Sequence, residues 1–166
     1  DCLCSVYADP RSSAWEVVVV DNASADGSAD MVAREFPEAQ LIRSARNLGF
    51  SGGNNLGLAG ARGRHLLLLN SDTRVEPGAL GGMVDFADGD PRIGVVGPRL
   101  VDADGRLELS CGRTPSLSCE IVHKLLLHRL FPFFRFGRWH HQNARDVGWV
   151  TGACLMVRRD AALAVG

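Results

Sequence analysis

The chain has 166 residues, of which 46% are hydrophobic and 22% are charged, and its formal net charge at pH 7 is -1. This length suits one domain with a sizeable buried core, and the composition is that of an ordinary globular protein. The nearly neutral charge excludes the basic footprint of a nucleic-acid-binding protein, and no apolar run approaches the ~20 residues of a membrane-spanning helix.

The first half of the chain alternates predicted helices and strands. Asp1–Tyr7 is predicted to be the end of a helix, and a turn follows at residues 9–13. The β-branched run Val17–Asp21 predicts a buried strand that ends in polar residues. Ala29–Phe36 is predicted to form a helix stopped by a proline, and Gln40–Arg43 a short strand.

The next element, Phe50–Ala61, is predicted to be a helix although it carries several glycines in and before its first turns. Glycine inside a helix costs stability, so its presence calls for a reason. We interpret these glycines as allowing close approach of the backbone to a ligand, with a loose loop as the alternative.

His65–Asn70 contains four consecutive leucines and is predicted to be the central strand of the sheet, buried on both faces. The run ends in Asn70, Ser71 and Asp72, which must emerge at the carboxyl edge, where open α/β sheets bind their ligands. Asp72 offers the hard oxygen that Mg²⁺ or Mn²⁺ on a diphosphate prefers. The alternative is a simple turn after a strand.

The following residues predict a helix from Glu76–Gly78 to Ala87, a strand at Ile93–Val101 and a hairpin turn at residues 102–105. Arg106–Ser110 would pair back on that strand. The order of the elements predicts an α/β fold with an open, mainly parallel sheet flanked by helices and an antiparallel edge hairpin.

The last third of the chain is less regular. Residues 116–129 are predicted to be helical, and the aromatic and basic residues 130–141 to form a loop that covers the core. The alternative is a mobile flap or a surface that meets the membrane interface and a lipid-linked acceptor. We interpret His140 and His141 as solvated, because adjacent side chains of a strand point to opposite faces. Asp146–Arg158 predicts a further strand, and a last helix follows it.

Three segments together resemble the family 2 glycosyltransferases, the inverting enzymes of the GT-A (Rossmann-like) fold. They are Val-Val-Asp-Asn-Ala-Ser-x-Asp-Gly-Ser at residues 19–28, Arg-Asn-Leu-Gly-Phe-Ser-Gly-Gly-Asn-Asn-Leu-Gly at 46–57, and Asn-Ser-Asp at 70–72. The last resembles the Asp-x-Asp metal motif of the family. The closest similarity is to a bacterial rhamnosyltransferase-like branch, and it covers Leu3–Gly166.

The resemblance implies roles for individual residues and a divalent cofactor, Mg²⁺ or Mn²⁺. The implied metal ligand is Asp72. The implied nucleotide contacts are Asp21, Asn22, Ser24, Arg46, Asn55 and Asn70, and the implied contacts on the acceptor and donor-sugar side are Trp149, Thr151 and Gly152. Asn70 departs from the first Asp of the family motif and removes one charge, so we expect weak metal binding without the sugar nucleotide.

The implied activity is transfer of a sugar, with rhamnose first, from a dTDP- or UDP-sugar to a saccharide or lipid-linked acceptor in bacterial cell-wall polysaccharide biosynthesis. The alternatives are a nucleotide-sugar binding module or inactive fragment, and a nucleotidyltransferase, which would need a lysine-bearing phosphate loop. Five cysteines without a Cys-x-x-Cys pair favour a reducing compartment. We therefore expect the cytoplasm, with peripheral contact at the inner face of the membrane.

Against the family pattern, residues 1–166 are expected to be one incomplete GT-A domain. The family has a strand before the first helix, and its general base belongs to an acidic pair that would lie beyond Gly166. The catalytic base is therefore unassigned, and we expect this chain alone not to transfer sugar.

Overall fold

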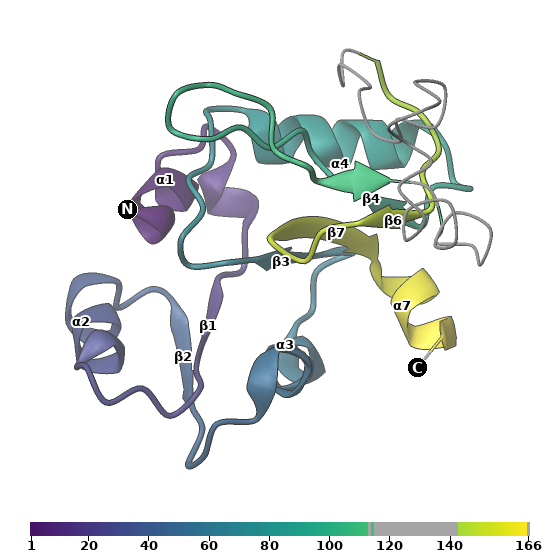
Figure 1. Cartoon of the computed structure of the whole chain (residues 1–166). Coiled ribbons are helices and arrows are strands. Elements are labelled where there is room, and N and C mark those ends of the chain that lie inside the picture. Colours follow the sequence, from purple (N-terminus) through teal and green to yellow (C-terminus); the bar gives the residue numbers. More distant parts are fainter. Residues whose placement is uncertain (113, 115–142, 166) are drawn as a thin grey trace, which may run out of the picture.

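The computed structural model describes residues 1–112, 114 and 143–165 (Figure 1). The predicted helix at 116–129 and the segment 130–141, with His140 and His141, lie outside the described residues. The elements, in chain order, are α1 (Cys2–Tyr7), the 3-10 helix η1 (Ser12–Ala14), β1 (Val18–Asp21), α2 (Ser28–Glu35), β2 (Gln40–Arg43), α3 (Gly49–Gly60), β3 (His65–Leu69), α4 (Ala79–Gly89), β4 (Val95–Val96), β5 (Cys111–Gly112), β6 (Trp149–Val150), β7 (Cys154–Arg158) and α7 (Arg159–Val165).

The strands combine parallel and antiparallel pairing, and the predicted α/β class is confirmed. β1 and β2 pair in parallel, with Val18 opposite Gln40. β7 lies between β3 and β4 and is antiparallel to both, so β3 and β4 run in the same direction. The prediction that β3 is the central strand is wrong for the described sheet. β7 takes that place because Cys154 and Met156, which are 5% and 4% exposed, face the hydrophobic core.

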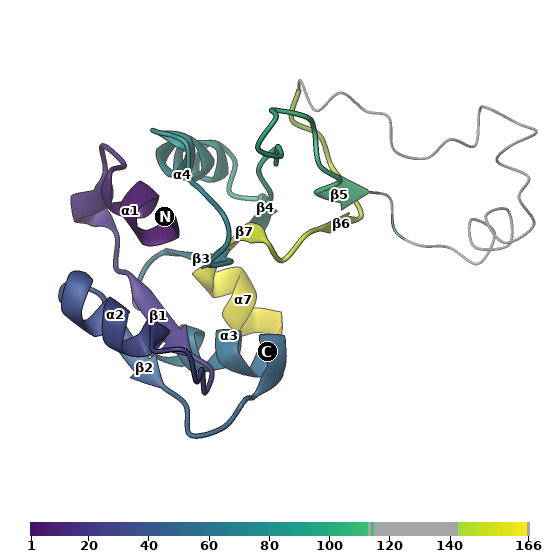
Figure 2. The ribbon, with the colours of Figure 1, turned by 60° about the vertical axis from the view of Figure 1, so that its left-hand side comes forward.

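The three-stranded sheet β3-β7-β4 has helices on both faces. Figure 2 shows α1 and α4 on one side of it and α3 and α7 on the other. The core lies on the α1 and α4 side, where its buried residues are Val6, Val75, Leu80, Met83, Cys154 and Met156. Among the residues that the structure describes, no helix is long and apolar enough to cross a bilayer.

The predicted strand Ile93–Val101 is shorter in the structure, where β4 covers only Val95–Val96. The strand ends at the two residues that follow it, Gly97 and Pro98. A Cβ on Gly97 would lie 2.7 Å from Cγ1 of Val150, and Pro98 has no amide hydrogen for the ladder. The predicted hairpin turn is confirmed, because Val101 bridges Leu107 in antiparallel fashion.

Candidate functional site

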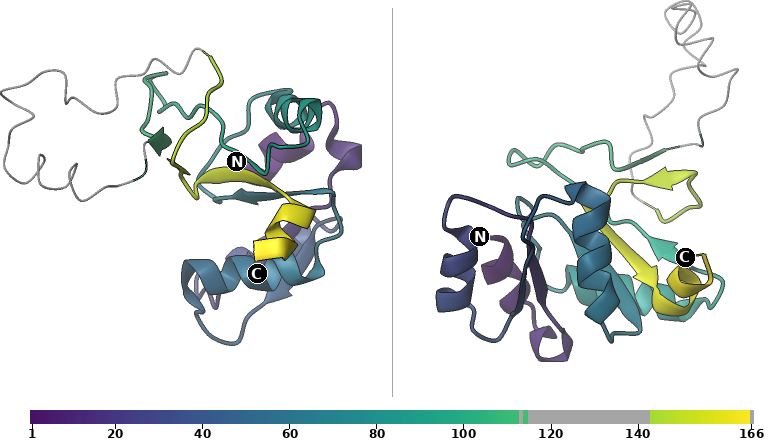
Figure 3. Two further views of the ribbon diagram at one scale, coloured as in Figure 1. Left: turned by 90° about the vertical axis from the view of Figure 1, so that its right-hand side faces the viewer. Right: turned by 90° about the horizontal axis from the view of Figure 1, so that it is seen from below.

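Polar residues follow β1 and β3 at the same edge of the molecule. β3 runs antiparallel to β7, and Figure 3 (right) shows β1 running opposite to β7 as well. Asp21 is the last residue of β1, and Asn70, Ser71 and Asp72 follow directly after β3. The two strands therefore run in the same direction, although they belong to different sheets.

Asp21 is half-buried and only partly engaged. Its Oδ1 accepts a hydrogen bond from the backbone amide of Ser24 at 3.2 Å, which closes the turn after β1. Its Oδ2 receives no hydrogen bond from any residue in the described part of the chain, so one carboxylate oxygen remains available to a ligand. The hydroxyl of Ser24 lies in the same exposed turn.

The side chain of Asn22 organises the segment before α3. Its Nδ2 donates to Oδ1 of Asn47 and to the carbonyl of Gly49, both at 3.1 Å, and its Oδ1 accepts from the amide of Leu48 at 2.8 Å. Gly49 adopts a positive φ of 71°, which favours glycine at this tight turn. Asn22 thus ties the end of β1 to the first turn of α3.

One glycine of α3, Gly57, serves helix packing. A Cβ on Gly57 would lie 3.1 Å from Cγ2 of Val20, and one on Gly53 would lie 3.5 Å from Nδ2 of Asn22. These two positions are one turn apart and form the face that packs on β1. Packing therefore explains the glycine at Gly57, whereas a Cβ on Gly53 would make only an ordinary contact, and close approach to a ligand there stays a prediction.

The predicted nucleotide contacts Arg46 and Asn55 are both exposed. Asn55 follows Gly53 by two residues, so the helical period turns it away from the face that packs on β1. Arg46 precedes the turn that Asn22 holds. Arg43, which ends β2, pairs with Asp21, so Arg46, three residues later, follows close to the end of β1.

The turn after β3 is fixed by backbone contacts. The amide of Asn70 donates to the carbonyl of Ala153 at 2.9 Å. The carbonyl of Asn70 accepts from the amide of Thr73 at 3.1 Å, and the Thr73 hydroxyl donates to it as well. These bonds hold the chain on either side of Asp72.

The carboxylate of Asp72 is exposed and makes no hydrogen bond or ion pair with the described residues. The thiol of Cys2 lies near it, because Cys2 donates to the carbonyl of Asn70 at 3.5 Å. Burial raises the pKa of the Cys2 thiol; the amino terminus lowers it, and the negative charge of Asp72 raises it further.

A metal ion at this edge would have one protein carboxylate. In the part of the chain that the structure describes, no three His, Cys, Asp or Glu side chains gather to hold an ion. Mg²⁺ commonly binds through one or two carboxylates and completes its shell with phosphate oxygens and water. A free Asp72 beside the polar Asn70 fits a metal that arrives with a diphosphate, and does not fit a site filled by protein ligands alone.

The turn between β6 and β7 borders the end of β3. The amide of Thr151 donates to the carbonyl of Ser110 at 2.8 Å, and its hydroxyl accepts from the amide of Ala153 at 3.4 Å. The indole of Trp149 lies over Gly112, where a Cβ would be 2.7 Å from Nε1 of the indole. Thr151 and Gly152 therefore lie next to Asn70, which bonds to Ala153. The indole of Trp149 instead covers Gly112, its partner in the β5–β6 pair.

Two residues near this edge were missed by sequence reasoning. The sequence predicts only a turn at Asp9, and in the structure this residue is 2% exposed and accepts hydrogen bonds from the amides of Arg11 at 2.9 Å and Gly78 at 3.1 Å. The sequence predicts a helix that begins at Phe50, and in the structure the exposed ring of this residue also contacts Gly152. A buried Asp is unusual for an Asp-Pro turn, and only its distant partner Gly78 explains it.

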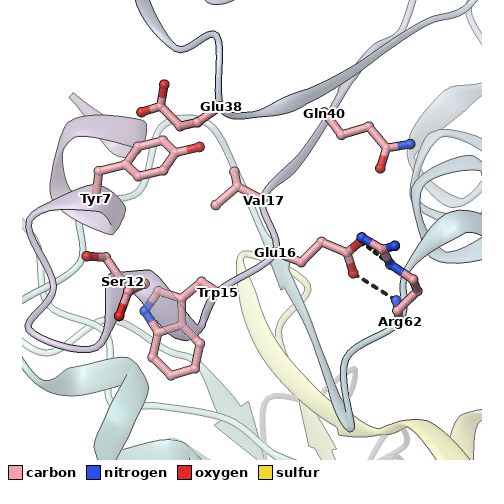
Figure 4. A pocket seen from close by; sticks show the side chains of 9 residues that line it. Tyr7, Ser12, Trp15, Glu16, Val17, Glu38, Gln40 and Arg62 are labelled. Carbon is pink, nitrogen blue, oxygen red and sulfur yellow. Dashed lines mark hydrogen bonds and ion pairs between the residues drawn. The ribbon is translucent and has the colours of Figure 1, made fainter.

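A pocket of about 550 Å³ lies at the other end of β1 (Figure 4). Its lining includes Tyr7, Trp15, Glu38 and the ion pair of Glu16 with Arg62. The backbone amide of Arg62 donates to Glu16 and lowers the pKa of that carboxyl. Because Glu16 precedes β1 and Asp21 ends it, this pocket is separate from the edge that carries Asp72.

Comparisons with known proteins agree on one family. The family model "Glycosyl transferase family 2" matches residues 1–165. An N-acetylglucosaminyl-diphospho-decaprenol L-rhamnosyltransferase of Mycobacterium tuberculosis is 31% identical over an alignment 169 positions long, which covers 90% of this chain and 54% of that protein. The succinoglycan biosynthesis protein ExoO of Rhizobium meliloti is 39% identical over 110 residues, covering 62% of this chain and 32% of that protein.

A solved structure shares the fold. It is the mannosyltransferase PcManGT from Pyrobaculum calidifontis in complex with GDP-Man and Mn²⁺, with a TM-score of 0.62 and 22% sequence identity. The alignment covers 99% of this chain and 41% of that protein. The chain thus spans about half the length of its first curated relatives.

Proposed function

Because the chain belongs to glycosyltransferase family 2, we propose that it acts in transferring a sugar, with inversion, from a nucleoside-diphosphate donor to a hydroxyl acceptor. The observation that carries this proposal is the pair of available carboxylates, Asp21 and Asp72, at the ends of β1 and β3. Two such groups, at the ends of strands that run in the same direction, could engage the base and the diphosphate of a single nucleotide. We further propose that residues 1–166 are part of one GT-A domain.

Asp72 is the residue that would hold Mg²⁺ or Mn²⁺ in the Asn-Ser-Asp segment. The ion would neutralise the charge of the departing diphosphate as a Lewis acid. The protein's part is to fix the position of this carboxylate, which the backbone bonds of Asn70 to Ala153 and Thr73 achieve. The amide side chain of Asn70 would contact the ribose or a water on the ion.

The nucleoside would lie at the end of β1. The free Oδ2 of Asp21 can accept the imino hydrogen of uracil or thymine, and the hydroxyl of Ser24 can contact the ribose. Asn22 contributes by holding the turn at residues 47–49, which carries Arg46 beside the nucleotide. For Asn55, a contact with the nucleotide remains a proposal from the family resemblance.

The donor and acceptor are proposed from the relatives. The name of the mycobacterial relative specifies an L-rhamnosyltransferase acting on a diphospho-decaprenol-linked sugar. We propose a dTDP- or UDP-sugar, with rhamnose first, as donor, and a lipid-linked saccharide of cell-wall polysaccharide synthesis as acceptor. Thr151 and Gly152 would face the donor sugar, with Trp149 on the acceptor side. Such an acceptor would bring the protein to the cytoplasmic face of the membrane.

Replacing Asp21 with asparagine should weaken nucleotide binding even without metal. The variant loses a charged acceptor for the imino hydrogen, which typically costs about 1–3 kcal/mol, or roughly 5- to 150-fold in Kd. Calorimetric titration of UDP, dTDP and CDP in EDTA would measure this. The parent should prefer UDP or dTDP over CDP, because cytosine has no imino hydrogen to donate.

The control for this substitution is Asp26→Asn. Asp26 lies in the same loop, and its Oδ1 already accepts from the amide and hydroxyl of Ser28. Its replacement removes the same negative charge as Asp21→Asn. Because no contact between Asp26 and the nucleotide is proposed, nucleotide affinity should change little. Equal affinity of the parent for UDP and CDP would remove Asp21 from the base-binding site.

A further inference from the structure

Phe50 is an aromatic side chain left largely in solvent at the edge that carries the site. It is the second residue of α3, and it is 59% exposed. Its ring touches the turn between β6 and β7: a Cβ on Gly152 would lie 2.9 Å from Cζ and 3.1 Å from Cε1. Gly152 does not have a positive φ, so its backbone conformation does not favour glycine, and a Cβ there would push the tip of the ring aside.

The ring connects the two strand ends of the site. On one side, Asn22 at the end of β1 donates to the carbonyl of Gly49, the neighbour of Phe50, at 3.1 Å. On the other side, Gly152 precedes Ala153, whose carbonyl accepts from Asn70 at 2.9 Å. Figure 3 (right) shows the first turn of α3 beside the segment that joins β6 to β7. The neighbours of the ring in the chain and in space are therefore bonded to the segments that follow β1 and β3.

We infer that Phe50 is the platform on which the hexose of the nucleoside-diphosphate sugar stacks, an inference that rests on the function proposed above. The hexose is bonded to the diphosphate, so a diphosphate at Asp72 would bring it close to Gly152, because Ala153, the next residue, bonds to Asn70 and the ring lies against Gly152. The face of an aromatic ring carries negative charge density and attracts the polarised C–H groups of a sugar face. The donor sugar covers the exposed ring, and Gly152 keeps the ring in place.

The test compares the affinities for dTDP and dTDP-rhamnose in the presence of Mn²⁺, measured by calorimetry on the 166-residue chain. In the parent, dTDP-rhamnose binds more tightly than dTDP. In Phe50→Ala this advantage falls about 3- to 10-fold, while the affinity for dTDP stays within about twofold. Phe50→Tyr keeps the ring and retains the advantage. The control is Phe86→Ala, which removes a ring of similar exposure, 48%, from α4.

A second variant tests the same contact by changing Gly152, the residue against which the Phe50 ring lies. Gly152→Ala pushes the tip of the Phe50 ring away and produces the same loss of affinity for dTDP-rhamnose. Combined with Phe50→Ala it adds no further loss, because the two substitutions act on one contact. Thermal melting of each variant checks that the fold is retained.

Three results would overturn the inference. Phe50→Ala weakening dTDP and dTDP-rhamnose equally would place the ring against the nucleotide or in the fold. Unchanged binding of dTDP-rhamnose in Phe50→Ala would show that the ring does not contact the donor sugar. A parent that binds neither compound with Mn²⁺ would remove the proposed function itself, and the inference with it.

Discussion

Replacing Asp72 with alanine is expected to abolish the metal-dependent binding of a nucleoside diphosphate while the protein stays folded. Asp72 is exposed, and no described residue bonds to its carboxylate, so no folding role is lost. Surface substitutions of this kind usually change stability by less than about 0.5 kcal/mol. Residues that only support a metal ligand cost about 10- to 100-fold in metal affinity when replaced, so loss of the ligand should cost at least about 100-fold.

Calorimetric titration with Mn²⁺ and dTDP measures this loss. Glu76→Ala is the matched control, because Glu76 is another exposed carboxylate four residues further along the same segment. The control removes the same charge and should retain binding. If Asp72→Ala binds dTDP and Mn²⁺ as the parent does, Asp72 is not the metal ligand.

Replacing Asp9 with alanine is expected to be strongly destabilising. Asp9 is 2% exposed, and its two carboxylate oxygens accept from the amides of Arg11 and Gly78. An amide that loses its partner in a buried place costs about 1–3 kcal/mol, so the two together should cost about 2–4 kcal/mol. For a chain of this size the melting temperature should fall by roughly 5–15 °C.

Thermal and urea denaturation of Asp9→Ala test this expectation. Asp9→Asn keeps one acceptor oxygen and should lose less stability. Asp85→Ala is the control on the same contact between η1 and α4, because it breaks the exposed ion pair of Asp85 with Arg11. Exposed ion pairs contribute little, so its melting temperature should stay near that of the parent. A loss in Asp9→Ala as small as in this control would show that the two amides find other partners.

The local parts of the fold and site could be predicted from the sequence. Short apolar runs ending in polar residues located both β1 and β3, because a strand buried in the sheet must expose its polar continuation at an edge. The hairpin at residues 102–105 followed from local turn chemistry. These predictions depend on residues that are close together in the chain.

The features that were missed or misread depend on distant partners. Asp9 is buried because Gly78, 69 residues away, donates to it. Gly57 of α3 is explained by the close approach of Val20 on β1, which no local pattern reveals. The central place of β7 results from a core formed with α1 and α4, and the position of Phe50 results from Gly152.

The central claim is that a divalent ion binds beside Asp72 together with a nucleoside diphosphate. Amide NMR spectra of the parent protein with dTDP, recorded with Mn²⁺ and with Mg²⁺ as the diamagnetic reference, test it most directly. Mn²⁺ broadens the signals of nearby amides, and the effect falls steeply with distance. We expect the strongest broadening at residues 70–73 and at Ala153, which bonds to Asn70. Broadening centred on the acidic hairpin at residues 102–105, or no broadening with dTDP present, would contradict the proposed site.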